Sequence, residues 1–516
     1  MSITAPPDVA VEERPLNRGM ITISVMLATI MTVLDSTIAN VALPHMAGSM
    51  SASADQITWV LTSYIIATAI MTPLTGWLAG RLGVKQVFVI TIVGFTLASA
   101  ACGASQSLVQ IVIFRILQGA FGAAMGPLSQ SVMLDTYPIE ERGPAMAIWG
   151  VGVTTAPILG PVLGGWLTDD FSWRWVFYIN LPVGLLCLLG VSTFLPPDRH
   201  THKMPLDLMG FGLLSVTLAS FQLFLDRGQN NDWFSSLETT LEASVAAVTF
   251  ALFLIHTLTV ERPFLRLELL KDRNFVSASL LNLALGLLVF SVMAFLPPML
   301  ESLMGYPVIT TGLVTAPRGI GSMISMMVVG RLVGKVDTRI LILSGLGVFA
   351  VSFYQMSHFS LLMGSYEVAM TGFIQGLGTG MVFTPMTVLA FATLDPALRT
   401  DGTGVFALLR NVGNSAGISV MQTMFTRTVQ VVHSRLVEGL TPGNPAAMPP
   451  YLPSGSLTTA LGVAALDGQV SRQAAMVAYV DVYHMMFLTT VVVAPMVLLM
   501  RPGKRAALPP EEMVVE

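Results

Sequence analysis

Long apolar segments follow one another along the chain, and short polar stretches separate them. A helix needs roughly 20 mainly apolar residues to cross the hydrocarbon core of a bilayer. Because fourteen segments meet this requirement, we predict an all-α polytopic membrane protein with 14 transmembrane helices. The predicted spans lie near 20–42, 57–79, 86–105, 109–131, 145–167, 175–196, 208–226, 238–260, 275–297, 310–333, 339–358, 362–391, 403–426 and 479–500.

These spans group into two halves with an insertion between them. We expect a six-helix bundle in each half, and we expect the two additional helices to be inserted between the bundles. The predicted organisation comprises a cytoplasmic N-terminal segment 1–18, an N-terminal half 19–197, two inserted helices in 206–261, a C-terminal half 274–500 with a long outward loop 427–478, and a cytoplasmic tail 501–516.

Composition agrees with a membrane protein and excludes several other classes. Apolar residues make up 53% of the chain and charged residues only 11%, whereas soluble domains carry about 25% charge. The net charge of −4 and the lack of a long basic run argue against a nucleic-acid partner. The two cysteines, Cys102 and Cys187, lie in apolar stretches, which argues against a disulfide scaffold and against a Cys-rich metal site.

The distribution of charge predicts the orientation in the membrane. If the N-terminus is cytoplasmic, most of the 26 basic residues fall in inward segments, and the short outward loops hold only Arg174 and Arg227. This bias follows the positive-inside rule. It predicts an even number of spans with both termini in the cytoplasm.

A sequence repeat predicts the architecture of the two halves. Segments 76–85 and 330–339 both read G-x-L-x-G-[RK]-[LV]-x-x-[KR], and Gln118-Gly119 is echoed by Gln375-Gly376 at nearly the same spacing. The copies run in the same direction through the bilayer, so they indicate parallel repeats with a substrate site between the halves near mid-bilayer. The alternative is that a G-x-L-basic pattern simply recurs at inner membrane boundaries.

Several motifs resemble those of the major facilitator superfamily, in particular its 14-span drug:proton antiporter branch. The similarity covers essentially the whole chain and is greatest to multidrug efflux pumps of the EmrB type. In the loop motif, Gly80 replaces the acid that is usual there. The matching motifs are a gating loop with Gly76, Arg81, Gly83 and Lys85, Arg115-x-x-Gln118-Gly119 in span 4, the antiporter motif Gly160-Pro161-x-x-Gly164-Gly165 in span 5, Leu34–Pro44 in span 1 and Trp173–Pro182 at the entry to span 6.

The resemblance implies proton-coupled export of hydrophobic toxic compounds across the bacterial inner membrane. It also implies a periplasmic adaptor protein and an outer-membrane channel as partners, with the proton gradient rather than a cofactor as the energy source. We expect the outward loop 427–478 to be the main contact with the adaptor, together with 226–236.

Asp35 and Arg115 are the main candidates for proton coupling. A carboxylate inside a span is costly unless it faces the protein interior, and such residues often mark proton pathways. At 1.5 Å per residue, Asp35 lies roughly 12 Å and Arg115 roughly 9 Å from the outer ends of their spans, so the two side chains can meet. Arg115 favours the ionised form of Asp35, while desolvation favours the protonated form. A static ion pair that joins spans 1 and 4 remains the alternative.

Other polar residues within spans are weaker candidates for a substrate site or a second coupling site. A buried guanidinium needs an acid, helix carbonyls or water, which the sequence does not identify. Structural roles for the arginines, and a solvated position at the mouth for Glu367, remain open. These candidates are Thr37, Asn40, Gln118, Arg318, Glu367 and Arg410.

The antiporter and loop motifs each allow two interpretations. Glycines in span 5 permit close helix approach and its prolines bend the helix, which suits a tight span between the halves or plain small-residue packing. Arg81 and Lys85 suit contacts with helix ends that close the cytoplasmic side, or a topology anchor alone.

We considered three rival functions. An importer or exporter of a specific polar metabolite would place more aromatic and amide side chains inside the spans. A membrane enzyme lacks support, because the chain has no Walker A loop, no H-E-x-x-H and no Cys/His cluster, so we expect no metal or cofactor. The charges embedded in the spans argue against a purely structural scaffold.

Overall fold

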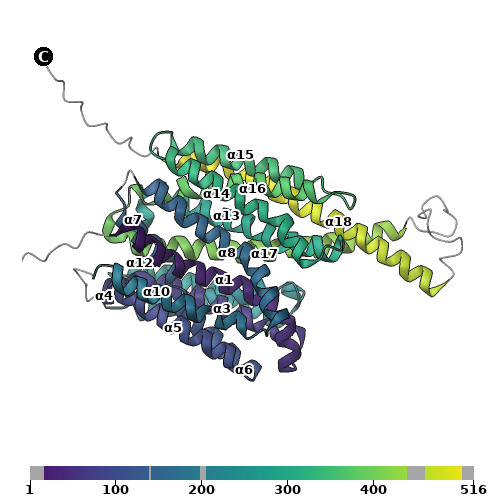
Figure 1. Cartoon of the computed structure of the whole chain (residues 1–516), viewed down its shortest axis with the longest axis horizontal. Helices are drawn as coiled ribbons and strands as arrows, with labels where there is room; N and C mark the ends of the chain where they lie inside the picture. Colours follow the sequence, from purple (N-terminus) through teal and green to yellow (C-terminus); the bar gives the residue numbers. More distant parts are fainter. Residues whose placement is uncertain (1–16, 139–140, 198–204, 439–458, 502–516) are drawn as a thin grey trace, which may run out of the picture.

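The computed structural model describes residues 17–138, 141–197, 205–438 and 459–501. Over these ranges the chain forms an all-helical bundle, so the predicted fold class is confirmed (Figure 1). The predicted terminal segments 1–18 and 501–516 lie almost entirely outside the described residues.

The N-terminal half contains six membrane-length segments, some of which consist of consecutive helices. Prolines and glycines account for several of these breaks, because proline removes a backbone donor. The helices are α1 (Arg18–Met50), α2 (Ala54–Ile57), α3 (Trp59–Met71) continued through η1 (Thr72–Leu74) into α4 (Thr75–Leu82), α5 (Val84–Ala104), α6 (Leu108–Gly122) followed by α7 (Met125–Thr136), α8 (Arg142–Asp170), and α9 (Trp175–Tyr178) followed by α10 (Asn180–Phe194).

The inserted pair and the C-terminal half follow in chain order. The pair is joined by a short connection, and a linker leads from it to the second bundle. The helices are α11 (Leu208–Arg227), η2 (Trp233–Ser235), α12 (Leu237–Thr259), η3 (Leu267–Lys271), α13 (Arg273–Pro298), η4 (Met299–Leu303), α14 (Val308–Leu332), α15 (Thr338–Met356), α16 (Ser365–Ala392), η5 (Pro396–Leu398), α17 (Arg399–Glu438), α18 (Ala460–Val493) and η8 (Ala494–Leu499).

Among the described residues, 13 helices are long and apolar enough to cross a membrane. The remaining predicted span, 403–426, is the thirteenth in chain order and lies in α17, which falls outside that set. The reason is that α17 carries polar side chains toward the protein interior, among them Arg410, Asn411 and Asn414. A helix that faces a polar cavity need not be apolar all round.

The two halves repeat the same helix pairing. In the first half α1 packs on α8, α3 on α6 and α5 on α6; in the second half α13 packs on α17, α14 on α16 and α15 on α16. Glycines allow the close approach in both halves: a Cβ at Gly160 would overlap Thr37 of α1, and a Cβ at Gly417 would meet the backbone of Leu287 in α13. This pairing is what parallel repeats require.

The repeated motifs occupy equivalent connections but turn at different residues. The chain turns between α4 and α5 at Gly83, with φ of 92°, and between α14 and α15 at Gly334, with φ of 90°. Only glycine adopts such angles without strain. Gly334 aligns with Gly80 in the repeat, so the second copy places its left-handed residue three positions earlier.

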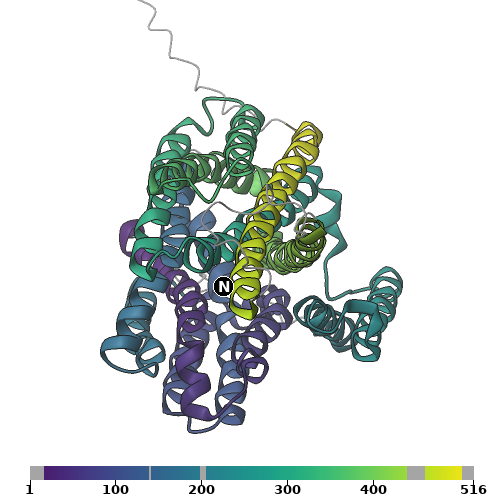
Figure 2. The ribbon, with the colours of Figure 1, turned by 90° about the vertical axis from the view of Figure 1, so that its right-hand side faces the viewer.

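The α8 and α14 helices form the largest contact between the halves. A Cβ at Gly143 would lie 2.5 Å from the carbonyl oxygen of Gly330, and one at Gly150 would lie 2.8 Å from the sulfur of Met326. The inserted pair lies to one side of the bundles (Figure 2). Its α11 contacts both α3 and α17, so it bridges the halves.

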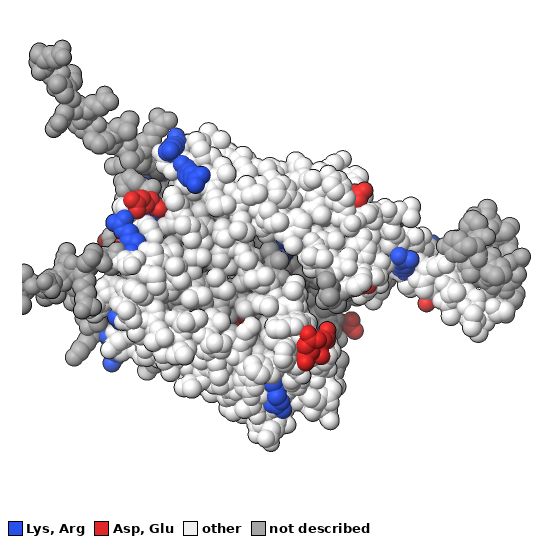
Figure 3. Space-filling model, viewed as in Figure 1, with Lys and Arg blue, Asp and Glu red and all other residues white. Residues whose placement is uncertain are grey.

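The surface divides into an apolar band and charged ends. Figure 3 shows the charged residues gathered toward the two ends of the long axis, with a largely uncharged band between them. Large apolar side chains are exposed within that band, such as Leu97, Leu186 and Ile255. Such a surface suits hydrocarbon rather than water.

One expected loop is mostly helical. Within the predicted loop 427–478, α17 continues to Glu438 and α18 begins at Ala460, while 439–458 lie outside the described residues. The two helices extend beyond the bundle at one end (Figure 1). The sequence prediction was wrong there because it required apolar composition of a helix, and helical turns beyond the hydrocarbon do not need it.

Candidate functional site

A fully buried ion pair lies in the middle of the N-terminal half. Arg115 of α6 donates to the Oδ2 atom of Asp35 in α1 over 2.7 Å, and both side chains are 0% exposed. The structure therefore brings together the two residues that were predicted to meet.

Neighbouring amides complete the coordination of the pair. The Oδ1 atom of Asp35 accepts hydrogen bonds of 2.8 Å from Gln118 and from Asn180. Arg115 also donates to the side-chain oxygen of Gln118 and to the backbone carbonyl of Val60. Three side-chain donors therefore satisfy both oxygens of the buried carboxylate.

An aromatic side chain covers the guanidinium. The Cζ atom of Arg115 lies 4.2 Å from the centre of the Tyr64 ring of α3, within the range of a cation–π contact. Tyr64 also lines the central cavity. It thus stands between the cavity and the ion pair.

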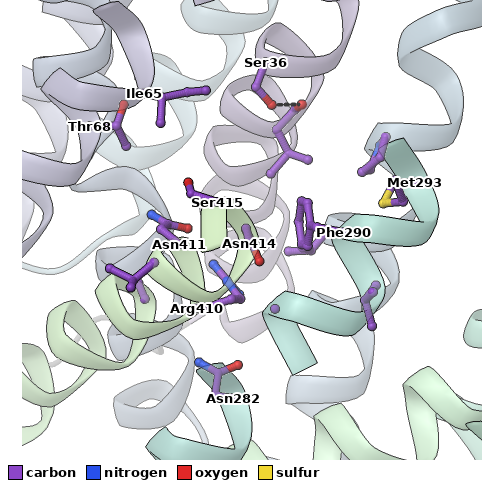
Figure 4. Close-up of a pocket in the computed structure, with 18 of the residues that line it drawn as sticks. Ser36, Ile65, Thr68, Asn282, Phe290, Met293, Arg410, Asn411, Asn414 and Ser415 are labelled. Atoms are coloured by element: carbon purple, nitrogen blue, oxygen red, sulfur yellow. Dashed lines mark hydrogen bonds between the residues drawn. The ribbon is translucent and has the colours of Figure 1, made fainter. Parts of the chain in front are cut away.

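The central cavity has a volume of about 390 Å³ and lies between the halves. Figure 4 shows Ser36 of α1, Phe290 and Met293 of α13, and Arg410 and Asn411 of α17 around the same space. Helices α3, α8, α11 and α14 supply further lining. A concave, largely apolar cavity with a few polar groups is typical of small-molecule sites.

Two predicted cations line this cavity. Arg318 of α14 donates to the side-chain oxygen of Gln375 over 3.3 Å. Arg410 of α17, which belongs to the same half, lines the same cavity beside Asn414. The structure thus places Arg318 and Arg410 in one site, although they lie far apart in the sequence.

Three other candidates lie elsewhere. The hydroxyl of Thr37 donates to the carbonyls of Val33 and Leu34 in its own helix. Asn40 is exposed on α1, and Glu367 is exposed in the first turn of α16. Polarity inside a predicted span did not show which face of the helix each side chain occupies. Gln118, by contrast, belongs to the ion-pair network.

The antiporter motif serves close packing of α8 on α1. A Cβ at Gly160 would overlap Thr37, and one at Gly164 would lie 3.2 Å from the carbonyl oxygen of Ile38. Pro161 lies within the same helix. Gly165 has nothing within 4 Å of the position of a Cβ, so the close approach predicted for it is wrong.

The loop motif lies at one end of the molecule, where its residues contact both halves. Lys85 donates to the carbonyls of Ser192 and Leu195 at the end of α10 over 2.7 Å each. Gly76 packs so closely on Asp401 of α17 that a Cβ would overlap the carboxylate. Arg81 is exposed and stacks on Trp77, 5.1 Å from its ring.

Further polar contacts join the halves at this end. Arg399 of α17 pairs with Asp135 of α7 over 2.8 Å, and the hydroxyls of Ser131 and Thr400 lie 3.0 Å apart. Asp401 also pairs with Arg266 over 3.2 Å. Acids of α7 and α17 therefore supply charge pairs at the end where Gly80 has replaced the usual acid of the loop.

The comparisons with known proteins agree with this architecture. Residues 25–418 match the family model of the Major Facilitator Superfamily. The chain belongs to that superfamily. As a member of the Major Facilitator Superfamily it is a transporter and not an enzyme. Over the described ranges, no group of three or more His, Cys, Asp or Glu residues is placed to hold a metal ion.

Related proteins and solved structures extend this assignment. The chain is 37% identical to the multidrug export protein EmrB of Escherichia coli K12, covering 85% of this chain and 87% of that protein. It is 36% identical to the fatty acid resistance protein FarB of Neisseria gonorrhoeae, covering 82% and 83%. The human organic anion transporter MFSD10 shares the fold with a TM-score of 0.59 at 14% identity, covering 92% of this chain and 100% of that structure.

Sequence analysis did not single out two members of the network. Asn180 begins α10 and belongs to the quoted span 6 motif, where an amide within an apolar stretch was the available signal. Tyr64 gave no such signal, because tyrosine is common in spans and its contact with Arg115 depends on how α3 packs on α6.

A double-mutant comparison tests whether the ion pair acts as a unit. Asp35→Asn or Arg115→Gln alone leaves one buried charge unpaired, which typically costs about 3–5 kcal/mol. We expect each single variant to lower the thermal unfolding midpoint of the purified protein more than the Asp35→Asn/Arg115→Gln double variant does. Strictly additive losses would contradict this interpretation of the pair.

Proposed function

We propose that the protein is a proton-coupled antiporter that exports hydrophobic toxic compounds. The single observation that carries the proposal is the position of Asp35 beside the central cavity. Val33 and Ser36 of the same helix turn line that cavity, and Tyr64 joins it to Arg115. Relatives named multidrug export proteins support the substrate class, as does the apolar lining of the cavity.

The charges of the site suggest how a proton could drive export. In the network the carboxylate of Asp35 accepts hydrogen bonds from Arg115, Gln118 and Asn180. A proton entering from outside would neutralise Asp35 and weaken its attraction for Arg115. Arg115 would then need other acceptors, which favours a different packing of α1 and α6. Return to the ionised state would release the proton inside.

Alternating access requires the two halves to rock about the cavity. The contacts of Asp135 with Arg399 and of Gly76 with Asp401 close one end in this structure. The interface of α8 with α14 is the natural pivot, because Gly143 and Gly330 let the two backbones touch. The proton gradient supplies the free energy in this scheme, with no bound cofactor.

Asp35→Asn should uncouple export from the proton gradient. In proteoliposomes loaded with a fluorescent hydrophobic drug, an imposed pH gradient should drive uphill transport by the wild type and not by Asp35→Asn. We expect at least a tenfold fall in the uphill rate, with drug binding retained, because the variant keeps the shape of the side chain but cannot ionise.

The matched control is Asp170→Asn, which removes an exposed carboxylate at the end of α8. It should transport like the wild type. Uphill transport by Asp35→Asn at the wild-type rate would remove Asp35 from the coupling mechanism, and wild-type transport that ignores the pH gradient would reject antiport altogether.

We further infer a place in the bacterial inner membrane with both termini in the cytoplasm. The positive-inside distribution supports this orientation. It puts the projecting ends of α17 and α18 outside, where they offer a contact for a periplasmic adaptor and, through it, an outer-membrane channel. The exposed faces of these projections include Leu436, Val437 and Leu461.

Thiol labelling and a short deletion test the orientation and the contact together. The native thiols Cys102 and Cys187 are buried. An impermeant maleimide added to spheroplasts should therefore label the Gly443→Cys variant and leave the Lys504→Cys variant unlabelled.

Deletion of 440–458 should spare membrane insertion but lower drug resistance in cells at least fourfold. Inverted labelling would contradict the orientation, and unchanged resistance would contradict the adaptor contact.

A further inference from the structure

We propose that the central cavity selects hydrophobic compounds that carry a single negative charge, with Arg410 and Arg318 holding the anionic group. This inference rests on the proposed export function and names its substrate class. The three arginines that lie inside the membrane-spanning part of the described structure differ in the partners of their guanidinium groups.

Arg115 has the polar partners that a buried arginine with a structural role needs in this protein. Its guanidinium meets the carboxylate of Asp35, the side-chain oxygen of Gln118 and the carbonyl of Val60. A tyrosine ring covers it, and its side chain is 0% exposed. A cation in the hydrocarbon region is costly unless it is paired in this way.

Arg410 has no such set of partners. No hydrogen bond or ion pair joins its guanidinium to another of the described residues, and its side chain lines the cavity (Figure 4). The backbone beneath it is fixed, because a Cβ at Gly286 of α13 would lie 2.6 Å from the Arg410 carbonyl oxygen. A rigid helix thus presents a cation to the cavity without a counter-charge.

Arg318 offers a second cation to the same space. Its one hydrogen bond among the described residues is the 3.3 Å contact with Gln375, a neutral acceptor. Close packing fixes its helix as well: a Cβ at Gly376 would overlap the Arg318 carbonyl oxygen. The lining of the cavity includes Arg318 and Arg410 and, within the described part of the chain, no aspartate or glutamate.

The sequence repeat allows the surroundings of Arg318 to be compared with the equivalent position in the N-terminal half. Arg318 precedes Gly330 by the same number of residues as Tyr64 precedes Gly76, so the two are equivalent positions. The N-terminal half has there the aromatic ring that covers a neutralised ion pair. The C-terminal half has a cation instead, beside a glutamine equivalent to Gln118 but without an acid in contact. The missing counter-charge is what an anionic ligand would bring.

A ligand with a carboxylate and an apolar body matches these walls. A carboxylate can accept two parallel hydrogen bonds from a guanidinium, a strong and directional contact in a site of low dielectric constant. Phe290, Met293 and Ile65 offer apolar surface to the body. A cationic compound of the same shape would meet two like charges, which disfavours it.

Three compounds that share one apolar body test the proposal. They are 6-(dansylamino)hexanoate, its methyl ester and the corresponding trimethylammonium compound. Each is titrated by fluorescence against the purified full-length protein in lipid nanodiscs, with protein-free discs as blank. We expect the carboxylate to bind at least tenfold more tightly than the ester, and the cation to bind more weakly than the ester. Equal affinities, or preference for the cation, would overturn the inference.

Variants assign the preference to the two arginines. Arg410→Gln and Arg318→Gln should each lower the affinity for the carboxylate at least tenfold and leave that for the ester unchanged. Arg410→Lys, which keeps the charge, should retain a preference for the carboxylate and guards against loss through misfolding. The controls Arg427→Gln on α17 and Arg331→Gln on α14 change exposed arginines of the same helices and should bind like the wild type. A preference that survives both cavity variants would place the anion site elsewhere.

Transport measurements keep the two proposals apart. Proton-driven export of the ester and the cation, without preference for the carboxylate, would reject the anion site and leave antiport intact. Tight binding of the carboxylate that depends on Arg410, without proton-driven transport of any of the three compounds, would keep the anion site and reject the proposed export function.

Discussion

The buried ion pair of Asp35 and Arg115 requires the helices of the N-terminal half to supply polar groups around it. Two charges in an apolar interior are tolerated only where hydrogen-bonding groups replace water. Helices α3, α6 and α10 each supply such a group, through Val60, Gln118 and Asn180. The packing of α10 on α1 and of α6 on α3 is therefore part of the electrostatics of the site.

The central cavity takes its character from the contrast between the halves. Both halves pair their helices alike, yet the first contains a neutralised pair behind Tyr64 and the second presents Arg318 and Arg410 to the cavity. In the proposed mechanism, the N-terminal side of the cavity binds the proton and the C-terminal side recognises the charge of the substrate. The thin wall between the two sites, formed by Tyr64, is where the two events would interact.

Much of the fold could be predicted from the sequence, because the bilayer requires long apolar helices and penalises buried charge. The span pattern predicted the all-helical class, and the depths of Asp35 and Arg115 predicted their meeting. The face that each helix turns to its neighbours could not be predicted in this way. Asn40 and Glu367 proved exposed, and Gly165 faces open space. Asn180 and Tyr64 reach the ion pair only because of how α10 and α3 pack. The helical ends of α17 and α18 were missed because they lie beyond the hydrocarbon and lack its composition.

The central claim is that Asp35 changes protonation when the cavity is occupied. Substrate-induced infrared difference spectroscopy of the protein in lipid measures this directly, since a protonated carboxyl absorbs apart from a carboxylate. At a pH where a fraction of Asp35 is protonated, substrate should remove the protonated carboxyl band in the wild type, and the band should be absent in Asp35→Asn. If substrate leaves the carboxyl band of the wild type unchanged, or removes the same band in Asp35→Asn, the claim that Asp35 changes protonation is contradicted.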